Sequence, residues 1–317
     1  MTEQTRRPLK VGLGIQIFEE DSGRIPRWRE IGDLALHAEA VGFDSLWVPD
    51  HLLFDLGDPG RPPHGVWECW SVLSSLAAIT KRVELGTLVA CASFRNPALL
   101  AKMADTVDEI SGGRLILGLG AGYHEVEFRA FGYPFDHLVG RFEESLQIIS
   151  SLLRDGKVDF EGQFYTVREC ELRPRGPTRR GPPLMIGARP DRPRALRLLA
   201  QYADYWNEFS VNRMDELVPS LRAVDAACLK AGRDPSSLQR TIALLVDLPG
   251  SPSDPAKGGF SKYFASRTPA TGTPEQLAEL LRAYASAGVD HVQIFVSPLT
   301  MHAIDTLASV LETLDRG

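Results

Sequence analysis

The chain has few cysteines and no excess of basic charge. Its four cysteines, Cys69, Cys91, Cys170 and Cys228, are far apart, and none forms a C-x-x-C pair. This pattern predicts neither a zinc ribbon nor a disulfide framework, so reduced and mostly buried thiols are expected. The net charge of -6, from 35 basic and 41 acidic residues, leaves no electrostatic footprint for nucleic acid or for an anionic membrane.

Long hydrophobic runs are also missing. None is long enough to cross a bilayer, and residues 1–10, MTEQTRRPLK, lack the apolar stretch of a secretory signal. We therefore expect a cytoplasmic protein with no membrane partner. The composition, 44% hydrophobic and 24% charged, is that of a globular protein, and 317 residues suffice for one large α/β barrel or two ordinary domains.

Short apolar runs alternate with helical patterns along the chain. The runs predict strands at Leu9–Ile17, Asp44–Val48, Val83–Val89, Leu115–Leu119, Leu184–Ile186, Asp204–Trp206, Thr241–Val246 and His291–Val296. The helical patterns lie at Trp28–Ala40, Trp67–Ala78, Pro97–Ile110, Arg141–Leu153, Arg194–Gln201, Asp215–Lys230, Pro274–Ala287 and Ala303–Leu314. This alternation predicts an α/β fold, a (β/α)8 TIM barrel that forms a single domain over residues 1–317.

The links that follow strands are mostly longer than those that follow helices. Because barrel enzymes carry their working loops at the carboxyl ends of the strands, function is expected at that end. Two insertions stand out. Residues 154–183 contain a hairpin pattern at 158–167, expected near the opposite end of the barrel. Residues 247–273, rich in Ser, Pro, Gly and Ala, are either a mobile lid or a simple surface insertion.

Three alternate glycines, Gly118, Gly120 and Gly122, mark the end of the fourth predicted strand, within SGGRLILGLGAGYHEVE at 111–127. They fall on one face of the strand, where bare backbone can admit a flat ligand, whereas the leucines between them fall on the other face. A tightly turned strand end is the alternative. A dinucleotide fingerprint G-x-G-x-x-G is not completed, because Tyr123 stands at the place of the third glycine.

Four longer parts of the chain carry a family resemblance. They are AEAVGFDSLWVPDH at 38–51, ITKRVELGTLV at 79–89 with the segment 95–132, PPLMIGARP at 182–190 with ADYWN at 203–207, and GTPEQLAELLRAYASAGVDHV at 272–292. Read together, they resemble the bacterial luciferase-like family of flavin- and deazaflavin-dependent oxidoreductases. The resemblance implies a small-molecule substrate and a homodimer or larger homo-oligomer.

The LGLGAG and GTPEQ segments look most like family members that use coenzyme F420, a 5-deazaflavin. Other members use FMN, and the shared motifs do not separate the two cofactors. The resemblance therefore implies an oxidoreductase that transfers a hydride between F420 and a small organic substrate. The alternative is an FMN-dependent monooxygenase that directs reduced flavin against dioxygen. A protein that holds a cofactor without turnover also stays open.

No metal site is predicted. A metal-dependent barrel hydrolase is disfavoured, because His124-Glu125-Val126-Glu127 is not the zinc motif H-E-x-x-H.

Asp50 and His51 follow the second predicted strand and should lie at the working end of the barrel. A histidine can transfer a proton near neutral pH, and in deazaflavin-dependent relatives a histidine at this strand end lies by the cofactor ring. We expect His51 to be catalytic and Asp50 to contact the cofactor, with a structural histidine and a capping aspartate as the alternative. The resemblance also implies a cis peptide bond between Leu88 and Val89, backing the cofactor ring.

Tyr123 and Glu127 belong to the polar cluster after the fourth strand. In members of the family that oxidise sugar phosphates, a glutamate that acts as an acid stands at the place of Tyr123, and a tryptophan stands at the place of Asp55. The oxidation of sugar phosphates is therefore not expected here. Tyr123 is expected to donate a proton or to line the substrate space. Gly120, Gly122 and Glu127 are expected to bind the cofactor.

Gly187, Ala188 and Arg189 follow the fifth predicted strand and precede a helix. Backbone N–H groups at such a turn, with the helix N-terminus and the charge of Arg189, form a phosphate cradle. This resembles the phosphate site of the family, although relatives often have a second glycine where Ala188 or Arg189 stands. A plain strand-to-helix turn is the alternative.

Overall fold

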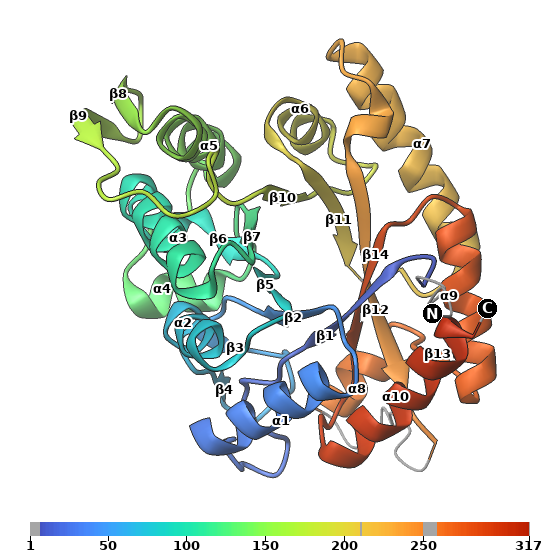
Figure 1. Cartoon of the computed structure of the whole chain (residues 1–317). Coiled ribbons are helices and arrows are strands. Elements are labelled where there is room, and N and C mark those ends of the chain that lie inside the picture. The colour runs from blue at the N-terminus through green and yellow to red at the C-terminus, as the bar shows by residue number, and fades with distance from the viewer. Residues whose placement is uncertain (1–6, 210, 250–258, 317) are drawn as a thin grey trace.

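The computed structural model describes residues 7–209, 211–249 and 259–316. In these ranges eight parallel strands form a barrel (Figure 1). They are β1 (Lys10–Gly14), β2 (Ser45–Val48), β5 (Glu84–Thr87), β7 (Leu115–Gly120), β10 (Leu184–Gly187), β11 (Tyr205–Phe209), β12 (Gln239–Asp247) and β14 (His291–Phe295). The order around the barrel is β10-β11-β12-β14-β1-β2-β5-β7, and β7 pairs with β10 to close the ring.

Helices cover the outside of the barrel. They are α1 (Trp28–Ala40), α2 (Cys69–Ile79), α3 (Pro97–Ser111), α5 (Leu138–Asp155), α6 (Pro193–Tyr202), α7 (Met214–Lys230), α9 (Pro274–Ser286) and α10 (Met301–Asp315). Local signals start some of them: the side chain of Asn96 accepts hydrogen bonds from the first turn of α3, and Thr273 forms a capping box with Gln276 at the start of α9. The predicted (β/α)8 barrel is confirmed, with element ends shifted by a few residues.

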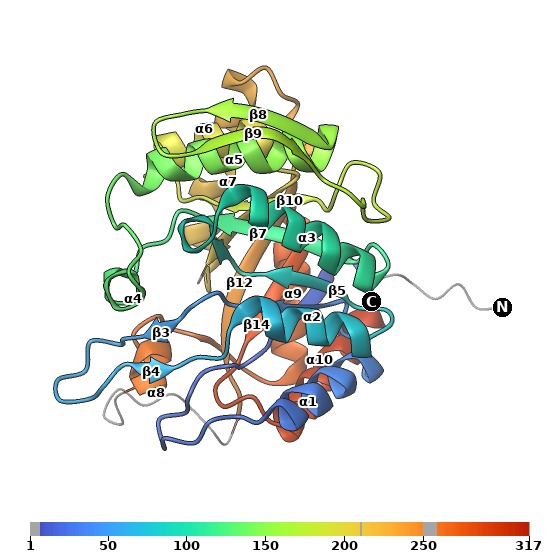
Figure 2. The ribbon, with the colours of Figure 1, turned by 90° about the vertical axis from the view of Figure 1, so that its left-hand side faces the viewer.

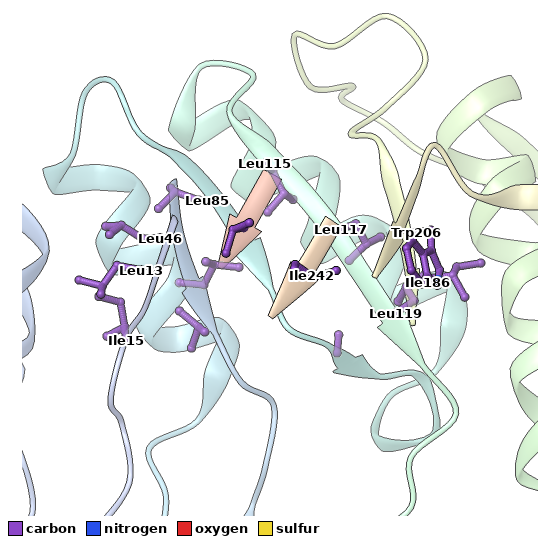
Figure 3. Close-up of a cluster of buried hydrophobic side chains, with 14 of the residues drawn as sticks. Leu13, Ile15, Leu46, Leu85, Leu115, Leu117, Leu119, Ile186, Trp206 and Ile242 are labelled. Carbon is purple, nitrogen blue, oxygen red and sulfur yellow. The ribbon is translucent and has the colours of Figure 1, made fainter. Parts of the chain in front are cut away.

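The strand residues alternate between two apolar environments. Leu115, Leu117 and Leu119 of β7 point toward the helices and join the main core, part of which Figure 3 shows. Ile116 lies inside the barrel, in a cluster with Trp47 and with Leu88, Met185, Tyr205 and Ala243. This matches the alternation expected of a strand that is buried on both faces.

The space beside the three alternate glycines is filled by the chain itself. A Cβ at Gly118 would collide with the carbonyl oxygen of the last residue of β5. A Cβ at Gly120 would lie 2.8 Å from Cγ2 of Val89, and one at Gly122 would lie 2.6 Å from Sγ of Cys91. The expectation that this face leaves open room for a flat ligand is therefore wrong, because the glycines admit the end of β5 and the segment after it.

Several short elements lie at the end of the barrel toward which the strands point. They are β3 (Leu53–Phe54), β4 (His64–Gly65), β6 (Ala90–Cys91), the 3-10 turn η1 (Ala92–Phe94), α4 (Glu125–Phe131), α8 (Gly259–Ala265) and β13 (Ala270–Thr271). Figure 2 shows β3, β4, α4 and α8 together at the left-hand end of the barrel. Of the insertion at 247–273, expected to be either a lid or a surface insertion, residues 250–258 lie outside the described residues, and the remainder includes α8 and β13.

The hairpin expected at 158–167 is present as β8 (Lys157–Glu161) and β9 (Thr166–Glu171). It lies along the outside of α5 instead of at the opposite end of the barrel, because the carboxylate of Glu144 in α5 accepts backbone hydrogen bonds from its turn, at 2.7 Å from Gln163 and 2.9 Å from Phe164. A second 3-10 turn, η2 (Pro235–Ser237), precedes β12. In the described part of the chain, each helix is too short or too polar to cross a bilayer.

Candidate functional site

His51 and Glu127 form a pair at the carboxyl end of the barrel. Nδ1 of His51, just after β2, lies 2.9 Å from Oε1 of Glu127 in α4. The backbone N–H of Leu52 donates to Oε2 of the same carboxylate at 2.7 Å. Because a carboxylate only accepts hydrogen bonds, the pair favours the proton on Nδ1 and leaves Nε2 of His51 for another contact.

The structure corrects the expected role of Glu127. Its side chain is 2% exposed, so the carboxylate has almost no surface with which to contact a cofactor. It stands behind His51 and fixes the orientation of the imidazole ring, in the way that carboxylates orient histidines in other sites. This arrangement suits Glu127 to positioning His51.

Tyr123 lies beside His51, with 5.9 Å between the ring centroids and the rings nearly perpendicular. Tyr123 lines a cavity, and 67% of the residue is accessible to solvent. Desolvation by the neighbouring residues raises the pKa of the Tyr123 phenol, and the positive charge of Arg267 opposes this rise. The phenol therefore carries its proton at neutral pH.

His124 is neutral, and its Nε2 atom is already occupied by a hydrogen bond within the protein. Burial lowers the pKa of His124, and its Nε2 accepts a hydrogen bond from the backbone N–H of Asp55 at 2.9 Å. The remaining ring proton therefore lies on Nδ1. His124 thus fixes the loop after β2 against the loop after β7.

A cavity of about 280 Å³ is lined in part by Tyr123 and His124, whereas His51 does not line it but has its ring near that of Tyr123. The loop that contains β3 and β4 forms one wall, and α8 with the residues after it forms another. The lining includes Phe54, Asp55, Tyr123, Lys262, Tyr263 and Arg267. Phe54 connects the cavity to His51, with ring centroids 4.6 Å apart. A space of this size suits a small organic molecule.

Asp50 lies beneath the rim and not on it. Its side chain is 0% exposed, and its oxygens accept hydrogen bonds from Arg95 at 2.6 and 3.1 Å and from the backbone N–H of Cys91 at 2.9 Å. With no accessible surface, Asp50 cannot touch a cofactor directly, and the structure corrects that expectation. Its role is to anchor the segment after β5.

The peptide bond between Leu88 and Val89 is cis, which confirms the prediction. Leu88 is 9% exposed and belongs to the cluster inside the barrel, against which Val89 packs. Val89 occupies the space left by Gly120. Gly120 and Gly122 therefore make room for neighbouring residues at the rim, and both glycines stay partly exposed.

The turn after β10 is open to solvent. A Cβ at Gly187 would meet nothing nearer than a backbone oxygen 3.9 Å away, so this position is accessible from outside. The N–H of Ala188 donates to the carbonyl oxygen of Asn207 at 3.1 Å and is not free for a phosphate, which corrects the expectation for Ala188. In the described chain, the N–H groups of Arg189 and Asp191 have no such acceptor, and the Arg189 side chain is 74% exposed.

Both parts of the site lie at the same end of the barrel, because β2 and β10 are parallel strands separated only by β5 and β7. The sequence interpretation missed Phe54, Tyr263 and Arg267, which complete the cavity. Phe54 follows β2 by six residues, and the other two lie in the insertion after β12, where periodicity gives no orientation. Among the described residues, no three His, Cys, Asp or Glu side chains gather as metal ligands would.

Comparison with known proteins assigns the chain to a family. Residues 10–248 match the model of the luciferase-like monooxygenase family. The chain belongs to this family. A phthiodiolone/phenolphthiodiolone dimycocerosates ketoreductase of Mycobacterium bovis is 31% identical over 273 residues, which cover 80% of this chain and 68% of that protein.

Two further relatives carry the name of a cofactor. An F420-dependent glucose-6-phosphate dehydrogenase of Amycolatopsis mediterranei is 35% identical over 148 residues, which cover 45% of this chain and 43% of that protein, less than half of its length. Among solved structures, an F420-dependent secondary alcohol dehydrogenase in complex with an F420-acetone adduct has a TM-score of 0.80 and 19% identity, covering 96% of this chain and 99% of that one. At that identity the likeness shows the shared luciferase-like fold alone.

Proposed function

We propose that this protein is an oxidoreductase that transfers a hydride between coenzyme F420 and a small organic substrate. The observation that carries the proposal is the His51–Glu127 pair at the carboxyl end of the barrel, where the His51 ring lies near Phe54 and Tyr123, two residues that line an accessible cavity. The choice of F420 is supported by the F420-dependent dehydrogenase that resembles part of this chain.

The residues present fit a cofactor that has a planar ring and a phosphate. The open position at Gly187 and the amides of Arg189 and Asp191 would hold the phosphate, because unpaired N–H groups favour anions. Leu88 and Val89 offer an apolar surface for a ring. When bound, F420 supplies the carbon that accepts or gives the hydride.

The chain itself supplies orientation and the proton. Glu127 holds His51 so that Nε2 is free to contact the ring or the reacting atoms. Tyr123, whose phenol stays protonated at neutral pH, is placed to give a proton to a substrate oxygen. A protonated phenol suits the reduction of a carbonyl group, which needs a proton donor.

The proposal is tested by titrating the purified protein with F420 and with FMN, followed by visible absorbance. We expect F420 to bind, and Arg189→Met to bind it more weakly. The control Arg168→Met removes an arginine from the exposed β8–β9 hairpin and should bind F420 as the parent does. Binding of FMN without binding of F420 would replace the proposal by an FMN-dependent monooxygenase.

Turnover is tested with the variants His51→Asn and Tyr123→Phe. Each should lower the rate of substrate reduction by reduced F420, because the first removes the ring nitrogen and the second removes the phenol proton. If both variants reduce substrate as fast as the parent protein, the site holds a cofactor without using these residues in catalysis.

A further inference from the structure

Aromatic rings from three separate segments of the chain line the cavity of about 280 Å³. Phe54 comes from the loop after β2, Tyr123 from the loop after β7 and Tyr263 from α8. The rings of Phe54 and Tyr263 meet edge to face, with centroids 5.8 Å apart. Such walls favour a planar, aromatic ligand, because ring contacts add to the energy of burial.

The helix that carries Tyr263 is held in place by two carboxylates. Asp21 accepts a hydrogen bond from the N–H of Phe260 at 2.8 Å. Asp58 binds Nζ of Lys262 at 2.6 Å, and this pairing lowers the pKa of the Asp58 carboxyl. The positive charge of Lys262 is therefore already neutralised by the protein.

Arg267 is different, because its charge has no carboxylate partner within 4.0 Å in the described part of the chain. Its guanidinium lies over the ring of Tyr263, 3.6 Å from the centroid. Nη1 donates to the carbonyl oxygen of Tyr263 at 3.2 Å and to the hydroxyl of Ser266 at 3.3 Å. A guanidinium has five N–H donors, so Nε and Nη2 keep theirs for a ligand.

Asp55 is a negatively charged residue that also lines the cavity. The charge of a ligand that fits therefore depends on whether it lies nearer to Asp55 or to Arg267. The carboxylate of Asp55 accepts a hydrogen bond from the N–H of Gly57 at 2.8 Å, and its charge acts on His124. The guanidinium of Arg267 instead lies over the ring of Tyr263, and both residues line the cavity together with Tyr123. The part of the cavity beside Tyr263 is therefore positively charged.

We propose that this cavity binds a planar aromatic aldehyde or ketone that carries a carboxylate. The carboxylate lies on Arg267, and the aromatic ring lies against Phe54 and Tyr263. The inference rests on the proposed function for its reaction: the carbonyl carbon gains a hydride from the reduced deazaflavin, and the carbonyl oxygen gains the phenol proton of Tyr123. The products are an alcohol and the oxidised deazaflavin, and solvent returns the proton to the phenol.

Three probes separate the features of this ligand. They are para-carboxybenzaldehyde, its neutral counterpart methyl para-formylbenzoate, and the non-aromatic succinic semialdehyde. With reduced F420 and the full chain, we expect the acid to reach its half-maximal rate at a concentration about 10- to 100-fold below that needed for the ester, as charge-assisted hydrogen bonds allow. Arg267→Met should remove this ratio, Arg267→Lys should keep part of it, and the hairpin control Arg168→Met should keep it entirely.

Equal KM values for the acid and the ester, or an equal loss of both in Arg267→Met, would overturn the assignment of the carboxylate to Arg267. If succinic semialdehyde showed a KM as low as the aromatic acid does, the aromatic part of the inference would be overturned. In either case turnover with F420 would still support the proposed function.

A binding experiment makes the inference independent of turnover. The alcohol product, para-carboxybenzyl alcohol, is titrated calorimetrically into the protein with and without F420. Binding that is lost in Arg267→Met supports the cavity assignment even if no reduction by F420 is found, in which case only the proposed function fails. No binding at millimolar alcohol under either condition would overturn the inference.

Discussion

His291 is a buried neutral histidine, and it should make the stability of the protein depend on pH. It is 1% exposed, and its Nε2 lies 2.7 Å from Oγ of Ser45, which also accepts a hydrogen bond from Nε1 of Trp47 at 2.7 Å. Nδ1 of His291 is buried and has no hydrogen-bond partner among the described residues, so a charged ring would leave a buried N–H donor unsatisfied. Burial, with a smaller contribution from the charge of Lys10, lowers the pKa of His291 to about 3.

The sign and size of the effect follow from linkage. Because the pKa of His291 in the folded protein lies below its ordinary value of 6.5, stability from the neutral ring is fully present above pH 6.5 and is lost as the pH falls toward 3. Between pH 7 and pH 5 the unfolded chain takes up most of one proton that the folded protein does not. This lowers the free energy of unfolding by about 2 kcal/mol.

The measurement is urea unfolding at pH 7, 6 and 5 of the parent protein and of His291→Gln. The glutamine side chain can still accept a hydrogen bond from Ser45 but cannot titrate. Its absolute stability does not matter, because the comparison is between slopes with pH. We expect the parent to lose about 2 kcal/mol more than the variant between pH 7 and pH 5. Equal slopes would refute the claim that His291 is held neutral by the fold.

Three further predictions concern the site and its support. Glu127→Gln should lower kcat by about 10- to 100-fold with little change in KM, because His51 loses its anionic partner. Steady-state kinetics would check this, with circular dichroism to show that the variant is folded. An unchanged kcat would contradict the prediction. Asp50→Asn should lower the free energy of unfolding by roughly 1.5–3 kcal/mol, because Arg95 loses one carboxylate partner and keeps Glu68, at 2.6 Å. A loss below about 1 kcal/mol in urea unfolding would speak against the importance of the Asp50–Arg95 pair. Gly118→Ala should cost roughly 1–3 kcal/mol, because the colliding atom is backbone and cannot rotate away; Gly187→Ala, where space is open, is the matched control and should leave the urea midpoint nearly unchanged.

The barrel could be predicted from the sequence because its signals are local. Apolar runs and helical periodicity placed the eight strands and eight helices, and caps such as Asn96 and Thr273 are visible as residue types. The short elements at the rim were not predicted, since α4 and α8 have only seven residues each. Segments of that length carry too little periodicity to be distinguished from loops.

The direction of side chains in loops could not be predicted in the same way. Asp50 and Glu127 were expected at the working end, and they do lie there, but both are buried under other residues. Their orientation depends on partners distant in sequence: Arg95 for the first and His51 for the second. The alternating glycines were misinterpreted for the same reason, because Val89 and Cys91, which fill the space beside Gly120 and Gly122, come from another strand's end.

The division of the rim into separately anchored pieces has a consequence for how the protein can diversify. In the proposed function, reactivity would depend on His51 and Glu127, which contact each other, and on the backbone N–H of Leu52, which donates to Glu127. Selectivity would depend on α8, a short helix held by Asp21 and Asp58 from two distant loops. Substituting Tyr263 or Arg267 would thus change the substrate specificity while leaving His51, Glu127 and Tyr123 in place. New specificities could therefore evolve without a change in the residues that transfer the proton.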